Sequence, residues 1–446
     1  MEKSEKYIAR AVDTELVKWK ADLQHKPLLV RGARQVGKSS SVRNFGKNFK
    51  YFLEINFEKN KNAHLVFDGD LSPKRICNDL SAIFLTPIIS GETLLFLDEI
   101  QSCENAIQSL RFFYEDYPEL HVIAAGSLLE FALKNLSSFG VGRIRSVFMY
   151  PFSFDEFLLA QGYSGLLEAK KGASPEMPLS ASLHDKLVEQ IRYFYLIGGM
   201  PAAVKLWIEK QNYKECKAVH NDIVLSYFDD FAKYHTKIDP QLLRNTLTTV
   251  AVNIGSKFKY SSVGAGYDSK QVKMALEMLT MAGLIIPVTH TSSNGQPLGY
   301  ETNEKIRKFI FIDTALLLNL HQLKIEDFLI STPVDFVNKG NLSEMFVGLE
   351  LVKYSDFFSK SDLFFWQREE QKTQAEVDYV IIRNGVLTPV EVKAGTRGSM
   401  QSLNIFLEKK KLTSGIRCSL EPFSIYANIE VIPLYAVSNF GLLQNL

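Results

Sequence analysis

The chain has 446 residues, of which 46% are hydrophobic and 23% charged, and its formal net charge at pH 7 is +1. This length is too great for one ordinary hydrophobic core and predicts roughly two to four domains, while the composition excludes wholesale disorder. The near-zero charge does not point to a strongly basic nucleic-acid-binding protein, although a local basic patch remains compatible with it.

Neither a disulfide framework nor a targeting segment is predicted. The four cysteines are scattered without metal-ligand spacing, which argues against structural zinc and favours a reducing compartment. Four of the first six residues are charged and no apolar stretch follows them, so no signal peptide is expected. The longest apolar stretches, such as residues 82–89, are too short to span a bilayer. We expect a cytoplasmic protein that does not associate with membranes.

Short apolar runs separated by helical segments fill the first part of the chain. They cover residues 28–30, 52–57, 93–97 and 121–125. Because these runs are mostly continuous rather than alternating, they predict strands that are buried on both faces. The expected fold class is α/β, with a parallel sheet whose strands are joined by helical crossovers.

A phosphate-binding motif follows the first run. Residues 32–39 match GxxxxGK[ST] in full, between a predicted strand and a predicted helix, which is the context that supports a P-loop. Lys38 is expected to reach the β- and γ-phosphates, and the Ser39 hydroxyl to bind Mg²⁺. The backbone N–H groups and the following helix N-terminus suit an anion. The residues predicted to contact the nucleotide in this segment are Gly32, Ala33, Arg34, Gln35, Val36, Gly37, Lys38, Ser39 and Ser40.

Two acids end the third apolar run. Asp98 and Glu99 follow residues 94–97, at the carboxyl end of a strand, where ligands bind in open α/β sheets. Asp98 is predicted to hold the Mg²⁺ shell, and Glu99 to act as the general base that polarises the attacking water. An acidic pair after a strand is otherwise typical of a helix N-cap, but a complete phosphate loop makes that the weaker interpretation.

These motifs resemble those of the AAA+ ATPases. Within them, the chain is similar to a prokaryotic group of uncharacterised function that combines a P-loop ATPase with a winged-helix segment and a C-terminal PD-(D/E)xK nuclease-like domain. The resemblance covers essentially the whole chain. Its segments are residues 31–39, 97–101, 125–127, 141–143, 151–157 and 198–201.

The resemblance implies roles for three further residues. Ser127 takes the position of the polar sensor of the γ-phosphate. Arg143 takes that of an arginine finger, with Arg145 as the rival, and a surface or ion-paired arginine is the alternative for either. Pro201 resembles the proline of a GxP turn that packs near adenine, although residues 198–201 also fit an ordinary helix-breaking turn.

The middle of the chain is predicted to be mostly helical. Residues 162–182 are expected to form a loop, and residues 183–231 to be mostly helical. Residues 239–252 and the segment that begins at Asp268 predict two helices, followed by two strands around a turn at residues 292–295. This order resembles a winged helix-turn-helix, whose second helix commonly enters the DNA major groove. The alternative is a docking module, because the second helix carries few basic residues.

Four charged residues near the C-terminus suggest a second site. Glu344 lies in a helical run and Asp378 in a strand. Asn384–Gly385 predicts a hairpin turn, and the returning strand places Glu391 and Lys393 on one face. This order resembles the PD-(D/E)xK nuclease fold, which implies a second Mg²⁺ or Mn²⁺ held by the acids, with the lysine beside the attacking water. An exposed hairpin with alternating charges is the alternative.

The sequence thus predicts an ATP-binding, Mg²⁺-dependent ATPase in four parts. They are an AAA+ core with a parallel sheet (1–160), a helical lid (161–235), a winged helix (236–315) and a nuclease-like α/β domain (316–446). The leading function couples ATP hydrolysis to a DNA-binding activity that includes a metal-dependent nuclease if the acidic site is active. The alternative is a regulatory switch that acts on protein partners through an inactive docking domain. A finger arginine further implies a homo-oligomer.

Overall fold

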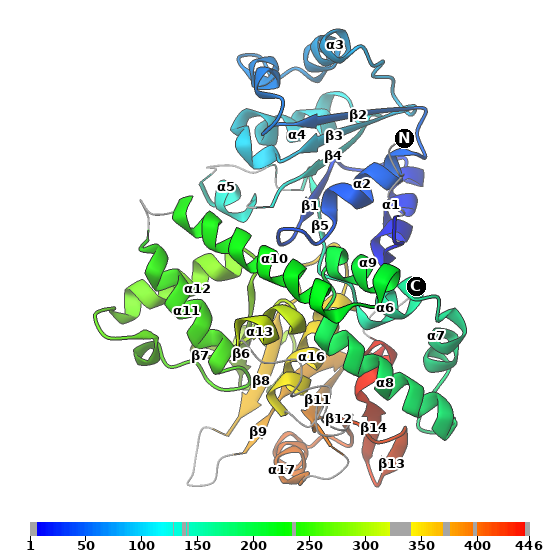
Figure 1. The fold of residues 1–446 in the computed structure, drawn as a ribbon, viewed down its shortest axis with the longest axis vertical. Coiled ribbons are helices and arrows are strands. Elements are labelled where there is room, and N and C mark those ends of the chain that lie inside the picture. Colours follow the sequence, from blue (N-terminus) through cyan, green and yellow to red (C-terminus); the bar gives the residue numbers. More distant parts are fainter. Residues whose placement is uncertain are drawn as a thin grey trace. The chain divides into compact units, whose positions relative to one another are not determined.

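The computed structural model describes residues 7–127, 129–135, 140, 142–233, 238–321, 340–368, 375–395 and 399–441 (Figure 1). The chain divides into two compact units. The first consists of Met1–Tyr150 together with Met281–Gly283 and Phe357–Lys360. The second consists of Pro151–Thr280, Leu284–Asp356 and Ser361–Leu446.

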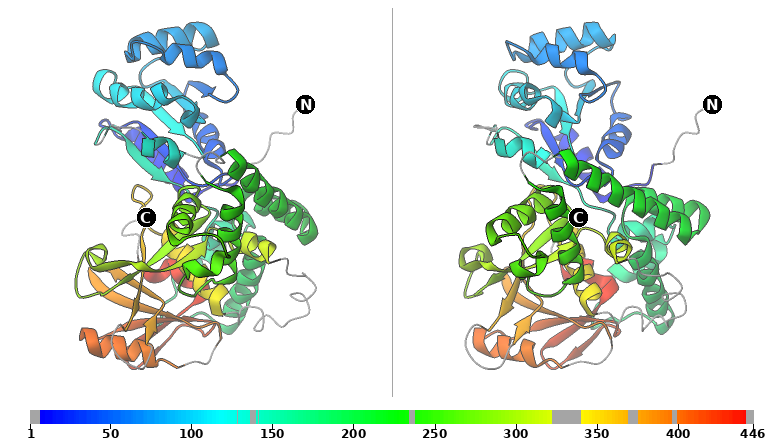
Figure 2. Two further views of the ribbon diagram at one scale, coloured as in Figure 1. Left: turned by 90° about the vertical axis from the view of Figure 1, so that its left-hand side faces the viewer. Right: turned by 60° about the vertical axis from the view of Figure 1, so that its left-hand side comes forward.

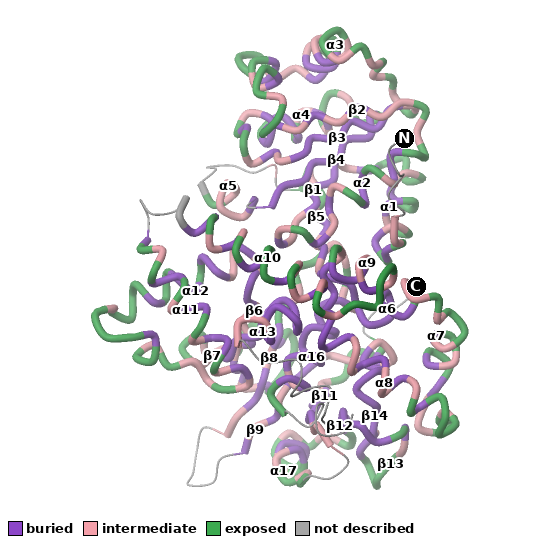
Figure 3. Tube along the Cα trace, viewed as in Figure 1, coloured by how far each residue is buried: buried purple, intermediate pink, exposed green. Residues whose placement is uncertain are grey.

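A five-stranded parallel sheet forms the centre of the first unit. Its order is β2-β3-β4-β1-β5, and the strands are β1 (Leu28–Arg31), β2 (Tyr51–Asn56), β3 (Thr93–Asp98), β4 (His121–Ala125) and β5 (Arg145–Phe148). All neighbouring pairs are parallel, which confirms the predicted α/β class. Every residue of β3 and β4 is buried, as expected for strands covered on both faces (Figure 3). β5 was not predicted, because it is short and its first residue is exposed.

One helix precedes the strands of this sheet and others lie between them in the sequence. They are α1 (Ala11–Ala21), α2 (Lys38–Gly46), α3 (Pro73–Phe84), α4 (Glu104–Asp116) and α5 (Leu129–Asn135), with 3-10 turns η1 (Lys61–Phe67) and η2 (Ile100–Ser102). α3 and α4 pack on the sheet through a hydrophobic cluster that includes Ile76, Leu95 and Leu110. This packing fixes the carboxyl ends of β1, β3 and β4, where the predicted site residues lie.

The second unit begins with a group of helices. They are α6 (Phe154–Ala160), α7 (Ser164–Lys171), α8 (Ala181–Ile197), α9 (Pro201–Lys210) and α10 (Tyr213–Lys233). The predicted loop over residues 162–182 is therefore wrong in part, because residues 164–171 are helical, and Leu167 of this helix is buried. The turn between α8 and α9 is held by the second unit itself: the N–H of Gly199 donates to Asp313 Oδ2 at 2.6 Å, and its carbonyl accepts from the N–H of Phe152 at 2.7 Å.

The segment predicted as a winged helix contains two helices and a hairpin. These are α11 (Pro240–Val252), α12 (Ser269–Met281), β6 (Ile285–Thr291) and β7 (Thr302–Phe311), with 3-10 turns η3 (Tyr260–Val263) and η4 (Leu298–Glu301). β6 and β7 pair antiparallel, as the sequence suggested. However, β6 also pairs in parallel with β8 (Leu363–Gln367), and β9 (Glu376–Val377) completes a sheet of order β7-β6-β8-β9. The hairpin thus belongs to a sheet shared with the C-terminal strands.

A second five-stranded sheet lies in the C-terminal part. Its order is β10-β11-β12-β14-β13, with β10 (Tyr379–Arg383), β11 (Val386–Val392), β12 (Gly415–Ser419), β13 (Ser424–Tyr426) and β14 (Ile429–Pro433). The predicted turn is present: Asn384 and Gly385 have φ angles of 50° and 75°, which a two-residue hairpin requires.

Helices α13 (Thr314–Leu320), α16 (Gly340–Lys353) and α17 (Gln401–Lys410) and the 3-10 segment η5 (Leu434–Phe440) accompany these sheets. α17 lies beside the C-terminal strands in both views of Figure 2 and packs Phe406 against Trp366 and Val380. A search of the described residues finds no helix with the length and hydropathy needed to cross a membrane.

Candidate active site

The phosphate loop joins β1 to α2 and uses glycine where the backbone requires it. Gly32 and Gly37 have φ angles of 143° and 98°, which favour glycine. A Cβ at Gly32 would also overlap the carbonyl oxygen of Met149. α2 begins at Lys38 directly after Gly37, so the N–H groups of its first turn face the space in front of the loop. This is the arrangement that binds a phosphate group.

Lys38 is buried inside this loop and is only 7% exposed. Its Nζ donates to the carbonyl oxygens of Gly32 at 2.9 Å and Ala33 at 2.7 Å. Burial lowers the pKa of Lys38 to about 8, even though the nearby charges of Glu99 and Asp98 oppose this shift. The ammonium group is therefore poorly compensated in the free protein, which favours an anionic ligand.

Ser39 and Asp98 meet at the end of β3. The Ser39 hydroxyl donates to Asp98 Oδ1 at 2.9 Å, and the amide of Asn56 donates to Asp98 Oδ2 at 3.1 Å. Burial raises the pKa of Asp98, while the hydrogen bond from Ser39 opposes this shift. A hydroxyl and a carboxylate that are this close supply the oxygen ligands that Mg²⁺ prefers, with water and phosphate oxygens completing its shell. The residues present therefore fit Mg²⁺.

Glu99 is the first residue after β3 and adopts a left-handed backbone with a φ angle of 51°. Its Oε2 accepts a hydrogen bond from Gln101 Nε2 at 2.7 Å. The amide oxygen of Gln101, Oε1, lies so near Gly126 that a Cβ atom added to Gly126 would overlap it. Gln101 thus lies between the predicted base and the turn that carries Ser127.

Sequence reasoning assigned no role to Gln101 or Asn56. The signal for Gln101 was its position two residues after the predicted base. Asn56 ends β2, the neighbour of β3 in the sheet, and is paired in register with Asp98. The order of the strands, which no motif reveals, was needed to recognise it.

The two residues predicted to respond to the γ-phosphate also lie in the first unit. Ser127 follows β4 and is 8% exposed, and its Oγ has no hydrogen-bond partner among the described residues. Arg143 forms an ion pair with Glu115 of α4, and 48% of its side chain is exposed. Val141, part of the motif around it, lies outside the described residues.

The rival arginine and the predicted adenine contact have other surroundings. The guanidinium carbon of Arg145 lies 3.4 Å from the centre of the Phe358 ring, so this side chain is stacked on an aromatic face. Pro201 is the first residue of α9 and belongs to the second unit. Its place beside adenine stays a prediction.

The four residues of the predicted nuclease site approach one another in the second unit. Asp378, between β9 and β10, accepts a hydrogen bond from the N–H of Val392 at 2.7 Å, and Lys393 Nζ donates to Glu391 Oε1 at 2.5 Å. Burial raises the pKa of Glu344 to about 8 and that of Glu391 to about 7, and in both cases the charge of Asp378 adds to the shift. Glu344, Asp378 and Glu391 therefore share one electrostatic environment.

A fifth residue that the sequence did not predict completes this cluster. Lys308 of β7 forms an ion pair with Glu344 at 3.0 Å and a second with Glu376. It lies within the segment predicted as a winged helix (236–315), and no sequence pattern assigned it to the acidic site. The ammonium of Lys308 therefore lies among the acids of the predicted site, in addition to that of Lys393. Among the described residues, no group of three or more His, Cys, Asp or Glu side chains is arranged to hold a metal ion.

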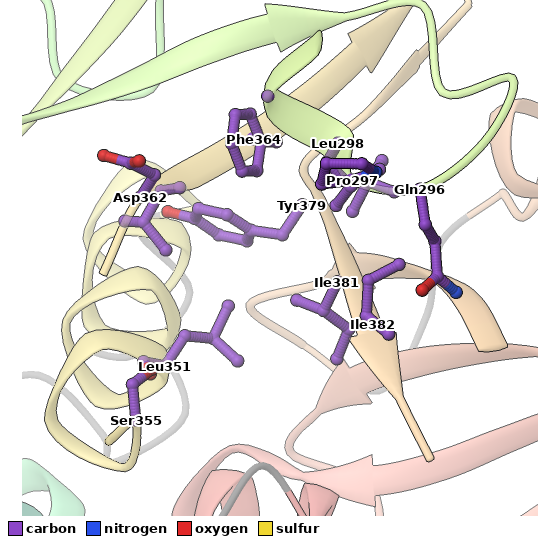
Figure 4. Close-up of a pocket in the computed structure, with 13 residues that line it drawn as sticks. Gln296, Pro297, Leu298, Leu351, Ser355, Asp362, Phe364, Tyr379, Ile381 and Ile382 are labelled. Carbon is purple, nitrogen blue, oxygen red and sulfur yellow. The ribbon is translucent and has the colours of Figure 1, made fainter. Parts of the chain in front are cut away.

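The second unit also contains a cavity of about 650 Å³. Figure 4 shows Tyr379, Phe364 and Ile381 lining it, with Leu351 contributed by α16 and Ser355 by the turn that follows this helix. Its lining is mainly apolar and includes none of Glu344, Asp378, Glu391 and Lys393. The cavity is therefore separate from the acidic cluster.

Three family models match parts of the chain. Residues 24–158 match the model described as an AAA domain. Residues 188–327 match a domain of unknown function, DUF8612, and residues 339–437 match another, DUF4143. A search of the curated proteins finds no match.

Solved structures with similarity to the chain include two archaeal proteins. A Walker-type ATPase of Pyrococcus abyssi is 17% identical, with a TM-score of 0.45, and the alignment covers 71% of this chain and 97% of that chain. The Orc1 protein of Aeropyrum pernix in complex with DNA is 10% identical, with a TM-score of 0.30, over 74% and 97% of the two chains. Because both TM-scores are below 0.5, nothing about this chain is inferred from these two structures.

The AAA match and the geometry of the first unit lead to the same conclusion. The matched segment contains the phosphate loop, Asp98 and Glu99, all of which lie at the carboxyl edge of a parallel sheet. The chain therefore carries a P-loop ATPase domain of the AAA+ type in residues 24–158.

Proposed function

We propose that this chain binds ATP with Mg²⁺ at the phosphate loop and hydrolyses it, with Glu99 as the general base. The observation that carries this proposal is the 2.9 Å hydrogen bond from Ser39 to Asp98. It joins the phosphate loop to the acidic end of β3, so that both halves of a nucleotide site lie at one edge of the sheet. Ser39 and Asp98 are 59 residues apart in the sequence, so the fold of the chain brings them into contact.

Each residue of the site has a defined task in this proposal. Lys38 exchanges its two backbone carbonyl partners for the β- and γ-phosphates, and the first turn of α2 donates its N–H groups to them. Ser39 and Asp98 would hold Mg²⁺, which when bound offsets charge on the phosphate oxygens. Glu99 orients the attacking water and accepts its proton, while Gln101 holds the carboxylate in place.

Substitution of the base tests this assignment. In Glu99→Gln, ATP binding should persist while hydrolysis falls by roughly 10²–10⁴-fold, because only proton transfer is removed. Glu104→Gln, an exposed residue at the start of α4, is the matched control and should hydrolyse ATP at the wild-type rate. A Glu99→Gln protein with wild-type turnover would disprove the role of Glu99.

Ser127 and Arg143 complete the proposed site. The Ser127 hydroxyl, which has no hydrogen-bond partner in the described part of the chain, is available to the γ-phosphate. The half-exposed Arg143 suits a finger that a neighbouring copy of the chain receives. Under this proposal, Arg143→Ala and Lys38→Ala proteins recover activity when they are mixed, because each supplies what the other lacks. A specific activity that does not depend on protein concentration would leave Arg143 a structural residue.

We further propose that hydrolysis is coupled to DNA binding by the second unit. Support comes from the order α11, α12, β6 and β7, with Lys270 and Lys273 exposed on α12. Regulation of a protein partner is the second candidate, and the Lys308 ion pairs favour it because they neutralise part of the acidic cluster. ATPase activity measured with and without duplex DNA at two salt concentrations separates the two: stimulation that weakens steeply with salt supports DNA, since phosphate contacts release counterions.

A further inference from the structure

A buried lysine such as Lys308 is unusual in a β-strand. It lies in β7 near its end, is 1% exposed, and its Nζ lies 5.0 Å from the centre of the Phe365 ring. A lysine buried to this degree needs compensation of its charge, since an unpaired ammonium would otherwise lose its proton. Compensation comes from three segments outside the hairpin: Glu344 from α16, Glu376 from β9 and Asp378 from the bend after it.

The carboxyl groups in this cluster outnumber the ammonium groups that reach them from inside. Two ammonium groups, those of Lys308 and Lys393, face four acids, which are Glu344, Glu376, Asp378 and Glu391. A third lysine, Lys257, approaches Glu376 from the surface at 3.9 Å. Burial alone would lower the pKa of Lys308, but the carboxylates raise it above the ordinary lysine value, so it stays charged. Burial raises the pKa values of Glu344, Asp378 and Glu391, and the charges of neighbouring acids add to this shift.

One acid in the cluster has a carboxylate oxygen that accepts no hydrogen bond from the described residues. Glu391 is 4% exposed, and its Oε2 has no hydrogen-bond partner among the described residues, although Oε1 accepts from Lys393. A buried carboxylate oxygen without a partner is costly. The cluster is thus an environment that suits a cation, and Lys308 and Lys393 supply the cations that are present in it.

We propose that Lys308 is the resident cation of the acidic cluster: its ammonium occupies the place of a divalent metal ion, locks β7 to α16 and β9, and keeps the cluster from binding Mn²⁺. The strand that carries it pairs with β6, which follows α12 directly. Lys308 belongs to the hairpin of β6 and β7, and its ammonium lies among the acids of the cluster. The ion pairs of the cluster therefore depend on the position of this hairpin. This inference does not rest on the ATPase assignment.

The test removes the ammonium of Lys308 by substitution and supplies Mn²⁺ in its place. Lys308→Ala should unfold at a lower temperature than the wild type without metal, and Mn²⁺ should restore part of the loss. In titrations with Mn²⁺, Lys308→Ala should bind at least about tenfold more tightly than the wild type, because oxygen ligands become free. A second substitution, Asp378→Asn, should abolish this gain, which separates it from Mn²⁺ bound at Ser39 and Asp98.

A matched control comes from another buried lysine of the same unit. Lys353 pairs with Glu350 at 3.0 Å and donates to the carbonyl of Phe152 at 2.9 Å. Lys353→Ala should also lose stability, but Mn²⁺ should not restore it. If Lys308→Ala does not fold, Lys308→Gln gives the same comparison, since it removes the charge and keeps a hydrogen-bond donor.

Two results would overturn the proposal. The first is a wild-type protein that already binds Mn²⁺ in a manner that Asp378→Asn removes, because the lysine would then exclude nothing. The second is a folded Lys308 variant that binds Mn²⁺ no better than the wild type. Either result leaves the ATPase assignment untouched.

Discussion

Two buried lysines, one in each unit, show how the partners of a charge determine its use. Lys38 lies beside Asp98 and Glu99, yet its Nζ donates to two backbone carbonyls, and burial lowers its pKa to about 8. Lys308 is paired directly with Glu344 and Glu376, and its pKa is raised. The first ammonium is held by neutral groups that a phosphate can replace. The second is paired with carboxylates of the chain itself.

The comparison separates a site prepared for an anion from a cluster already closed by an internal cation. In the first unit, the glycines of the loop and the N-terminus of α2 add further positive potential around Lys38. In the second unit, acids from α16, β9 and β11 surround Lys308. Similar residue types thus produce opposite electrostatic sites because the backbone supplies different neighbours.

The largest expected difference concerns stability. Lys308→Ala should lower the free energy of unfolding by roughly 3–5 kcal/mol, since it leaves buried carboxylates without their cation. Lys38→Ala should change it by less than about 1 kcal/mol at pH 7, because no carboxylate loses an ion pair there. Chemical denaturation of both variants in the absence of nucleotide measures the two values. Equal losses would show that Lys38 is also held mainly by carboxylates.

The second prediction concerns pH. Because the pKa of Lys38 is lowered to about 8 in the free protein, the group is charged below pH 8 and loses its proton above it. Bound phosphates favour the ammonium, so ATP affinity should be constant below pH 8 and fall by up to about tenfold per pH unit above it.

Calorimetric titration with ATP between pH 7 and pH 10 measures this dependence. Lys38→Arg is the matched control, because a guanidinium does not titrate in this range. Its ATP affinity, although weaker, should lack the decline that starts near pH 8. A wild-type affinity that stays flat to pH 10 would contradict the lowered pKa.

The smallest effect is expected at Gln101. Because its amide holds Glu99 at 2.7 Å, Gln101→Ala should lower kcat by roughly tenfold while the KM for ATP stays close to the wild-type value. The pH profile of kcat should also change, since Glu99 loses a hydrogen bond to its carboxylate. Gln108→Ala, an exposed position on α4, should leave both constants unchanged. A raised KM with normal kcat would instead indicate a role in nucleotide binding.

Local patterns predicted the elements whose signals lie within a few residues. The four predicted strands of the first sheet are present, and the continuous apolar runs of β3 and β4 are buried on both faces, whereas β2 is only partly buried. The hairpin turn at Asn384–Gly385 is present because only a few residue types tolerate its positive φ angles. The helix at residues 164–171 was missed because Gly, Ser and Lys around it are typical of loops, and it is stabilised by tertiary burial of Leu167.

By itself, the sequence determined the phosphate loop, the acidic end of β3 and the α/β class, since each depends on residue types at fixed short spacing. Only the tertiary structure decided which distant residues meet. It placed Asn56 and Gln101 beside the acids of the first site, joined β6 to β8, and brought Lys308 to Glu344. The physical reason is that ion pairs and strand order depend on long-range packing, and a single charged residue in a strand carries no local sign of the partner it will neutralise.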